Sequence, residues 1–437
     1  MCPTFLATGE EYMSTRGRAN AIRASLELRT VGDDPLRGYE LEEALSNCLS
    51  CKACTTECPS NVNMALLKAE LLYARHRRDG LPLRERMLSK VDLLGRLGCL
   101  TPSIANAALD FAPLRALMSK TLGISAQRPL PHYAHQRFDK WFRTRPRSRP
   151  RLGSAGAAPA LSGASPESSG SITHRTSSGS SAGAPKSAGE APALPSSTRG
   201  RVILWDDTFV RYHESHIGIA AVQVLETLGF EVTLAQGRKC CGRPAFSQGN
   251  LDEAKRLGAH NIGLLCARDS DVPVLFLEPS CYSMFVEDYR ELSLPDFDSV
   301  ATRSFLFEQF VEDILSRDPS ALQFTNGATH NVAIHAHCHA KSLMKPGFMA
   351  TLARRLPGRN VTLLETGCCG MAGAFGALES KYKLSTQVGA QLVEKIAEQP
   401  AATTIVASGT SCRHQIEHLT PVRPKHMAEL LADALRS

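Results

Sequence analysis

Residues 48–59 read Cys48-Leu49-Ser50-Cys51-Lys52-Ala53-Cys54-Thr55-Thr56-Glu57-Cys58-Pro59, a run with the spacing C-x2-C-x2-C-x3-C-P. In this bacterial spacing three thiolates hold one iron–sulfur cube, and the fourth cysteine, followed by proline, usually serves a different cluster. Zinc sites more often use two C-x2-C pairs separated by a long spacer. The run therefore predicts iron–sulfur ligands at Cys48, Cys51, Cys54 and Cys58, and a protein that handles electrons.

The composition is typical of a soluble globular protein. Of the 437 residues, 43% are hydrophobic, and no run of 18 or more apolar residues predicts a membrane span. The first residues lack the basic and apolar regions of a secretory signal. Fourteen cysteines without an export signal favour reduced, metal-binding thiols over disulfides. We therefore expect a cytoplasmic protein.

A low-complexity segment divides the chain. Of the 47 residues from Leu152 to Thr198, 35 are Ser, Ala, Gly or Pro, so the segment cannot bury enough apolar surface to offset its ordering entropy. The net charge of +7 is concentrated nearby, because residues 144–200 hold seven Lys or Arg and two Asp or Glu. We interpret residues 144–200 as a disordered linker and expect no nucleic-acid binding. A weak attraction to an anionic membrane surface or an acidic partner stays open.

The region before the linker, residues 1–143, is expected to be mainly helical. Asn63 is a suitable N-cap for an apolar-faced helix that ends at Gly80. Further helical patterns cover Leu83–Leu97 and Ser103–Thr121.

The region after the linker contains an internal repeat, residues 201–328 and 329–437. Each copy begins with an apolar strand, continues with a Cys-Cys-Gly box, and ends with another strand that delivers a cysteine. Helical stretches lie between these segments, at Ile217–Leu228, Leu251–Cys266 and Lys381–Glu398. Strands that alternate with helices predict parallel α/β units, which place ligands beyond the carboxyl ends of the strands.

The Cys-Cys-Gly boxes predict paired thiol ligands. Neighbouring side chains on a regular strand point to opposite faces, but the glycine after each pair permits a left-handed turn that brings both sulfurs to one side. A helix starting after each box would aim backbone N–H groups at the thiolates. We therefore expect metal ligands at Cys240, Cys241 and Cys281 in the first copy and at Cys338, Cys368, Cys369 and Cys412 in the second.

The first copy has one ligand fewer, because Thr208 stands where the second copy has Cys338. His213 and Asp207 are nearby substitutes. Zinc stays open as the metal at both boxes, since a set of four thiolates suits zinc equally well.

Three histidines precede or follow Cys338 at alternate positions. On a strand, His335, His337 and His339 would share one face and Cys338 would take the other. We expect these histidines to be structural or to face a quinone. No Gly-x-Gly-x-x-Gly run, phosphate loop or Ser–His–Asp grouping is present, so we expect no nucleotide or flavin site and name no catalytic residue.

The motif of residues 48–59 followed by two Cys-Cys-Gly domains resembles the iron–sulfur part of FAD-linked 2-hydroxy-acid oxidoreductases. This group includes the fused bacterial D-2-hydroxyglutarate and D-lactate dehydrogenases, the glycolate oxidase iron–sulfur subunit and a subunit of anaerobic glycerol-3-phosphate dehydrogenase. Heterodisulfide reductase subunits share the Cys-Cys-Gly domain. The resemblance implies a multidomain fold, in which a mainly helical ferredoxin-type 4Fe-4S domain precedes two repeated α/β Cys-Cys-Gly domains.

The likeness to the fused members extends to residues 1–20. There, a similar stretch follows a flavin domain and closes an upstream cysteine motif with its own Cys-Pro. The resemblance implies that Cys2 is the fourth ligand of the cube held by Cys48, Cys51 and Cys54, and that Cys58 serves a second cube whose other ligands precede residue 1. We therefore expect either a subunit with a separate flavoprotein or the tail of a longer protein, inactive by itself.

The resemblance implies an electron-transfer role. An FAD-binding subunit or domain would oxidise D-lactate, glycolate or D-2-hydroxyglutarate, and the electrons would pass through 4Fe-4S clusters to a quinone or cytochrome. Peripheral attachment to the inner membrane is compatible with this role. Two alternatives stay open, namely a heterodisulfide-reductase-like catalytic site at the Cys-Cys-Gly boxes and a zinc-binding or redox-sensing scaffold.

Overall fold

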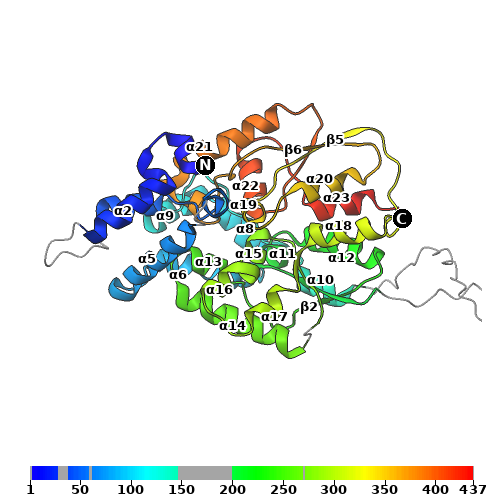
Figure 1. The fold of residues 1–437 in the computed structure, drawn as a ribbon, viewed down its shortest axis with the longest axis horizontal. Coiled ribbons are helices and arrows are strands. Elements are labelled where there is room, and N and C mark those ends of the chain that lie inside the picture. Colours follow the sequence, from blue (N-terminus) through cyan, green and yellow to red (C-terminus); the bar gives the residue numbers. More distant parts are fainter. Residues whose placement is uncertain (1, 28–37, 59–61, 146–198, 269–270, 437) are drawn as a thin grey trace, which may run out of the picture.

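The structure is a computed structural model that describes residues 2–27, 38–58, 62–145, 199–268 and 271–436. Its N-terminal helices cover one side of two α/β units, each of which is built on a small parallel sheet (Figure 1). The segment predicted to be a disordered linker lies almost entirely outside the described residues. The division of the chain at residues 143, 200 and 328 stays a proposal.

The N-terminal region is helical, as predicted. Asn63 caps the helix Met64–Asp79, because its side chain accepts a hydrogen bond from the backbone N–H of Leu66 at 3.1 Å, and Gly80 ends this helix. The elements are α1 Pro3–Thr8, η1 Glu11–Met13, α2 Thr15–Glu27, α3 Tyr39–Ser46, α4 Ala53–Glu57, α5 Met64–Asp79, α6 Leu83–Leu88, α7 Val91–Gly98, α8 Pro102–Asp110, α9 Ala112–Leu122 and α10 Phe138–Thr144.

Two helices predicted as continuous are each divided in two. The break between α8 and α9 falls at Phe111, whose backbone is extended. Pro113 explains it, because proline donates no helical hydrogen bond and crowds the preceding turn. The pattern over residues 83–97 is interrupted between α6 and α7 at Ser89 and Lys90.

The first α/β unit has four parallel strands in the order β2-β1-β3-β4. The strands are β1 Arg201–Trp205, β2 Glu231–Leu234, β3 Val274–Phe276 and β4 Ser304–Leu306. The helices are α11 Thr208–Tyr212, α12 Ser215–Thr227, α13 Arg243–Ser247, α14 Leu251–Arg268, α15 Pro279–Ser283, the π-helical turn η3 Met284–Asp288, α16 Tyr289–Glu291, α17 Phe297–Ala301 and α18 Phe307–Arg317.

The second unit has three parallel strands in the order β6-β5-β7, so the expectation of parallel α/β units is confirmed for both. The strands are β5 His330–Ile334, β6 Arg359–Leu363 and β7 Thr404–Val406. The helices are α19 Cys338–Leu343, α20 Gly347–Arg354, η4 Phe375–Ala377, α21 Glu379–Ala397, α22 Thr410–Leu419 and α23 Met427–Ala434.

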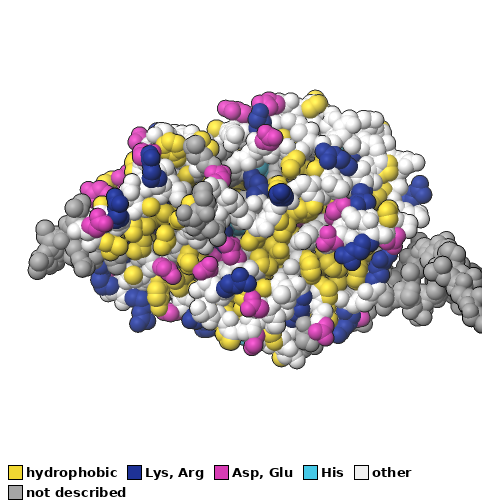
Figure 2. Space-filling view, in the orientation of Figure 1, with side chains coloured by type: hydrophobic (Ala, Val, Ile, Leu, Met, Phe, Trp, Pro, Cys, Tyr) yellow, Lys and Arg dark blue, Asp and Glu magenta, His cyan; other side chains and the backbone are white. Residues whose placement is uncertain are grey.

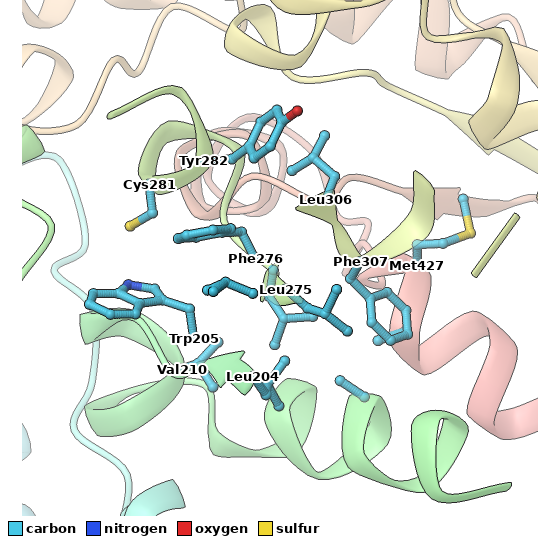
Figure 3. Close-up of a cluster of buried hydrophobic side chains, with 14 of the residues drawn as sticks. Leu204, Trp205, Val210, Leu275, Phe276, Cys281, Tyr282, Leu306, Phe307 and Met427 are labelled. Atoms are coloured by element: carbon cyan, nitrogen blue, oxygen red, sulfur yellow. The ribbon is translucent and has the colours of Figure 1, made fainter. Parts of the chain in front are cut away.

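One hydrophobic core spans the two α/β units. Figure 3 shows Trp205 and Phe276 from the first sheet, Phe307 from α18, and Met427, which α23 contributes from the end of the chain. Each of these large side chains is worth about 2–3 kcal/mol of burial free energy. Because the units share this core, cysteines carried by different units are held in a fixed relation to each other.

Within the described residues, no helix combines the length and the apolar character needed to cross a membrane. On the face seen in Figure 2, Lys and Arg side chains are interspersed with Asp and Glu.

Candidate metal centres

The first three cysteines of the N-terminal motif line one cavity together with Cys2. The loop before α4 passes through the left-handed region at Ser50 (φ 53°) and Lys52 (φ 61°). These conformations cost a residue with a side chain about 1–2 kcal/mol each, and they turn the loop around the cavity. The thiol-bearing residues in the cavity wall are Cys2, Cys48, Cys51 and Cys54.

A buried arginine holds Cys2 in this cavity. Arg18 Nη1 donates to Cys2 Sγ at 3.1 Å, while its Nε donates to the Ala44 carbonyl at 2.7 Å. Burial raises the pKa of the Cys2 thiol, but the Arg18 charge and the hydrogen bonds to Cys2 outweigh burial and lower the pKa. The charge of Arg18 therefore favours the Cys2 thiolate, the form that binds metal.

Cys54 and Cys58 occupy different environments. Burial, with the neighbouring thiols of Cys48, Cys51 and Cys2, raises the pKa of Cys54 to about 11. Cys58 caps the end of α4, where its backbone N–H donates to the Cys54 carbonyl at 3.0 Å. Cys58 is not among the residues that line the cavity, and Pro59 lies outside the described residues.

The second α/β unit brings its four cysteines together. Cys338 begins α19, Cys368 and Cys369 follow β6, and Cys412 lies in α22. The Cys368 thiol contacts those of Cys338, Cys369 and Cys51, and Cys369 contacts Cys412. The contact with Cys368 lowers the pKa of Cys338 to about 6, whereas its neighbours raise the pKa of Cys368 well above the ordinary value. These four thiols therefore form one closely packed set.

The first unit gathers three buried cysteines. Cys281 Sγ lies 3.1 Å from Cys241 Sγ. The pKa of Cys240 is raised well above the ordinary value, chiefly by its contact with Cys241 and then by burial. α13 begins directly after Gly242, whose φ is +87°, as expected for this box.

The corresponding helix is absent after the second box, so that expectation is wrong there. Gly370 also has a φ of +87°, but a turn and the short element η4 follow it. The Gly370 N–H still points at sulfur and lies 3.5 Å from Cys368 Sγ.

Thr208 and Cys338 occupy equivalent places, because each begins the helix after the first strand of its unit. Of the two proposed substitutes, Asp207 lies near the first thiol set. Contact with Cys241 lowers the pKa of Cys281, but burial and the charge of Asp207 outweigh it and raise this pKa to about 11. Burial and the nearby Glu278 raise the pKa of Asp207 itself to about 7. His213 instead places Nδ1 2.9 Å from the His132 carbonyl oxygen.

The histidines near Cys338 do not alternate along a strand, so that expectation is wrong. β5 ends at Ile334, and His337 caps α19 by accepting a hydrogen bond from the His339 N–H at 3.1 Å. The capping ring turns the chain into a helix, which places Cys338 and His339 side by side in its first turn. His335 Nδ1 lies 2.7 Å from Thr366 Oγ1, a structural contact.

The donor sets suit sulfur-ligated clusters. No disulfide joins the described cysteines, and within the described residues no three His, Cys, Asp or Glu side chains surround a point as ligands of a single ion would. The fit rests instead on groups of close, mostly buried thiols and on donors to sulfur from Arg18, Gly370 and the Ser50 N–H, 3.5 Å from Cys48 Sγ. Such N–H donors tune sulfur-ligated clusters.

Sequence reasoning missed several charged residues at these sites. Arg18 has no local signature that marks it. Lys52 and Arg243 do have one, because each stands directly after a predicted ligand or a Cys-Cys-Gly box. His339, which follows Cys338, was already named as a structural or quinone-facing residue.

Comparison with known families confirms the two kinds of domain. Residues 1–62 match the 4Fe-4S dicluster domain, and residues 208–286 and 332–417 each match the cysteine-rich domain. The dicluster match supports 4Fe-4S clusters as cofactors, as predicted.

Comparison with individual proteins confirms the resemblance. A subunit of anaerobic glycerol-3-phosphate dehydrogenase from Escherichia coli is 27% identical over 90% of this chain and 99% of its own length. D-2-hydroxyglutarate dehydrogenase from Pseudomonas putida is 23% identical over 99% of this chain, which spans 41% of that protein. Lactate utilization protein A from Bacillus cereus is 27% identical over 53% of this chain and 98% of its own length.

Proposed function

We propose that this chain, in which a 4Fe-4S dicluster domain precedes two cysteine-rich domains, is the electron-transfer part of a flavin-linked dehydrogenase. The observation that carries the proposal is that Cys51 packs against the buried cluster that contains Cys368. This contact joins the cavity of the N-terminal motif to the second cysteine-rich site. Iron–sulfur clusters bound at the two sites would supply one-electron chemistry at adjacent positions.

The proposed ligands follow the three groups of thiols. One 4Fe-4S cube is assigned to the cavity cysteines, and Cys58 is assigned to a second cube. Arg18 stabilises thiolate charge at Cys2, and the box glycines set the direction of the paired thiols. The ligand sets are Cys2, Cys48, Cys51 and Cys54 for the cube, Cys338, Cys368, Cys369 and Cys412 for the second cysteine-rich site, and Cys240, Cys241 and Cys281 for the first.

Metal analysis separates iron–sulfur clusters from zinc. Anaerobically purified protein should contain iron and acid-labile sulfide and should show EPR signals on reduction. A colourless protein that contains zinc alone would overturn the electron-transfer proposal and support the scaffold alternative.

The partner is proposed to be an FAD-binding dehydrogenase that oxidises a D-2-hydroxy acid and delivers electrons through this chain to a quinone or cytochrome. The name of one relative, D-2-hydroxyglutarate dehydrogenase, supports this class of substrate. A second name refers to lactate without its configuration, and a third points to glycerol 3-phosphate. The chain should therefore be mixed with candidate flavoproteins and with D-lactate, glycolate, D-2-hydroxyglutarate or glycerol 3-phosphate in turn.

The expected result is reduction of the clusters, seen by EPR, with one hydroxy acid and its flavoprotein. If only glycerol 3-phosphate and its flavoprotein reduce the clusters, the electron-transfer role stands but the substrate is not a D-2-hydroxy acid. Clusters that stay oxidised with every pair, yet accept electrons from dithionite, would overturn the partnership.

Peripheral attachment to the inner membrane is supported by an exposed apolar surface on helices α7–α9. Residues 83–122 carry six Lys or Arg and three Asp or Glu, so the segment that bears this surface has a net positive charge, which suits an anionic membrane. Sedimentation with vesicles of anionic phospholipid should recover the protein, and neutral vesicles should recover less. Absence from both would overturn the attachment. The exposed side chains are Leu93, Leu97, Leu100, Ile104, Phe111 and Leu117.

A further inference from the structure

Two residues that directly follow predicted ligands or a Cys-Cys-Gly box meet at one buried carboxylate, and a third such residue contacts one of the two. Lys52 follows Cys51, Arg243 follows the first Cys-Cys-Gly box, and His339 follows Cys338. The carboxylate is that of Asp288, the last residue of the π-helical turn η3, and its side chain is 0% exposed. A single π turn inside a helical segment often marks a functional position.

Lys52 reaches from the cube-binding loop into the first α/β unit. Its side chain is 0% exposed, and Nζ lies 2.8 Å from Asp288 Oδ1, 2.6 Å from Glu287 Oε2 and 2.9 Å from Ser283 Oγ. An ammonium removed from water in this way is tolerated only with close partners of opposite charge. The loop that carries Cys51 is therefore anchored through its neighbouring residue.

Arg243 connects the same carboxylate to the second unit. Nη1 donates to Asp288 Oδ2 at 2.9 Å, and Nη2 lies 2.9 Å from His339 Nε2. His339 Nε2 also lies 3.0 Å from the Ser50 carbonyl oxygen, which belongs to the cube-binding loop. One contiguous buried network thus joins the cube-binding loop, the first box and the helix that begins with Cys338.

We propose that Asp288 is a positioning residue that locks the cube-binding loop against both cysteine-rich sites. The inference rests on the electron-transfer role proposed above. Both carboxylate oxygens are engaged by cations, Lys52 at one and Arg243 at the other, and Ser283 Oγ donates to Oδ2 at 3.0 Å. Removing the charge of Asp288 would leave two buried cations with Glu287 alone, so the loop would shift. Since Cys51 contacts Cys368, such a shift changes the separation between the cube and the second site.

The test compares Asp288→Asn with a matched control. Glu312→Gln also removes a buried carboxylate, which binds Arg355 at 2.6 and 2.7 Å, but this pair does not touch the cube-binding loop. The reconstituted full-length proteins would be compared by iron and sulfide content, by magnetic interaction between reduced clusters in EPR, and by the rate of electron transfer between clusters after flash photoreduction.

Asp288→Asn should retain its iron and sulfide, show an altered magnetic interaction, and transfer electrons between clusters at least about tenfold more slowly, as small displacements do in preorganised sites. Glu312→Gln should match the wild type in all three measurements. Wild-type magnetic interaction and rate in a cluster-loaded Asp288→Asn protein would overturn the proposal.

If Asp288→Asn fails to fold, the variant Ser283→Ala tests the proposal instead. This variant removes one hydroxyl that binds both Lys52 and Asp288, and it should change the magnetic interaction in the same direction by a smaller amount. Unchanged interaction in Ser283→Ala would overturn the proposal in that case. If the electron-transfer role itself is wrong, the wild-type protein will show no interacting clusters, which is a different result from an unchanged variant.

Discussion

The two box glycines have the same backbone conformation but different surroundings, which predicts unequal effects of the same substitution. Gly242 and Gly370 both have a φ of +87°. A methyl group at position 242 would lie 3.2 Å from the backbone of Ala254, a tight contact that a small shift relieves. A methyl group at position 370 would overlap the carbonyl oxygen of Ser385, which is part of the helix α21 and cannot easily move.

The magnitudes follow from these surroundings. The left-handed conformation costs a residue with a side chain about 1–2 kcal/mol, so Gly242→Ala should lower the free energy of unfolding by about that amount. Gly370→Ala adds a backbone overlap, and overpacking typically costs about 1–3 kcal/mol more. The total for Gly370→Ala is therefore about 2–5 kcal/mol. The difference from Gly242→Ala, about 1–3 kcal/mol, is roughly five-fold to 150-fold in the folded-to-unfolded ratio, because about 1.4 kcal/mol is one factor of ten.

Denaturant unfolding of the cluster-loaded proteins, followed by circular dichroism and by visible absorbance, measures this difference. Gly263→Ala in the interior of α14 is the control, since nothing lies within 4 Å of its added methyl group, and it should stabilise by about 0.5–1 kcal/mol. Gly370→Ala should also lose iron, because the box carries Cys368 and Cys369. Equal destabilisation by Gly242→Ala and Gly370→Ala would refute the reasoning that the carbonyl of Ser385 fixes the second box.

Three further predictions concern the thiols and a buried acid. Cys51→Ser should remove one cluster signal from the EPR spectrum of the reduced protein, since a hydroxyl replaces a thiolate poorly, and an unchanged spectrum contradicts the ligand assignment. Cys369→Ala should lose more metal than Cys241→Ala, because four cysteines gather in the second unit and three in the first; equal loss would mean that another ligand completes the first site. Burial raises the pKa of Glu308 to about 7 from an ordinary value near 4.5. The native state therefore holds the proton while the unfolded state releases it, and stability falls as pH rises through that window. Glu308→Gln should reduce this fall in urea titrations between pH 5 and pH 8. Part of the fall should stay, because the pKa of Asp207 is also raised to about 7. A pH profile identical to that of the wild type argues against the role of Glu308.

Local signals in the sequence were sufficient for most of the fold. Asn63 and Gly80 mark the ends of α5 because capping depends on residues within one turn. The repeat was visible because both copies place cysteines after short apolar strands. Strands β2, β4 and β6 were not predicted, since polar residues interrupt them and they lack the apolar run that marks β1 and β3. They are also too short for an alternating pattern to stand out. The histidines after β5 were placed on a strand because they alternate in the sequence. The sequence alone does not show that one of these histidines caps a helix instead.

Local sequence signals did not predict how the thiol sites pack against each other, although several of the residues involved stand next to the cysteine motifs. The spacing of cysteines along the chain indicates which thiols can lie in the same turn. It does not indicate which of these turns contact each other in the folded protein. The contact between Cys51 and Cys368 and the meeting of Lys52 and Arg243 at Asp288 join segments from distant parts of the chain. A buried ion pair of this kind is weak evidence for stability, because desolvation offsets much of its attraction. Its retention at the junction of three thiol sites is better explained by positioning, since the network holds the residues that follow Cys51, Gly242 and Cys338 in one place.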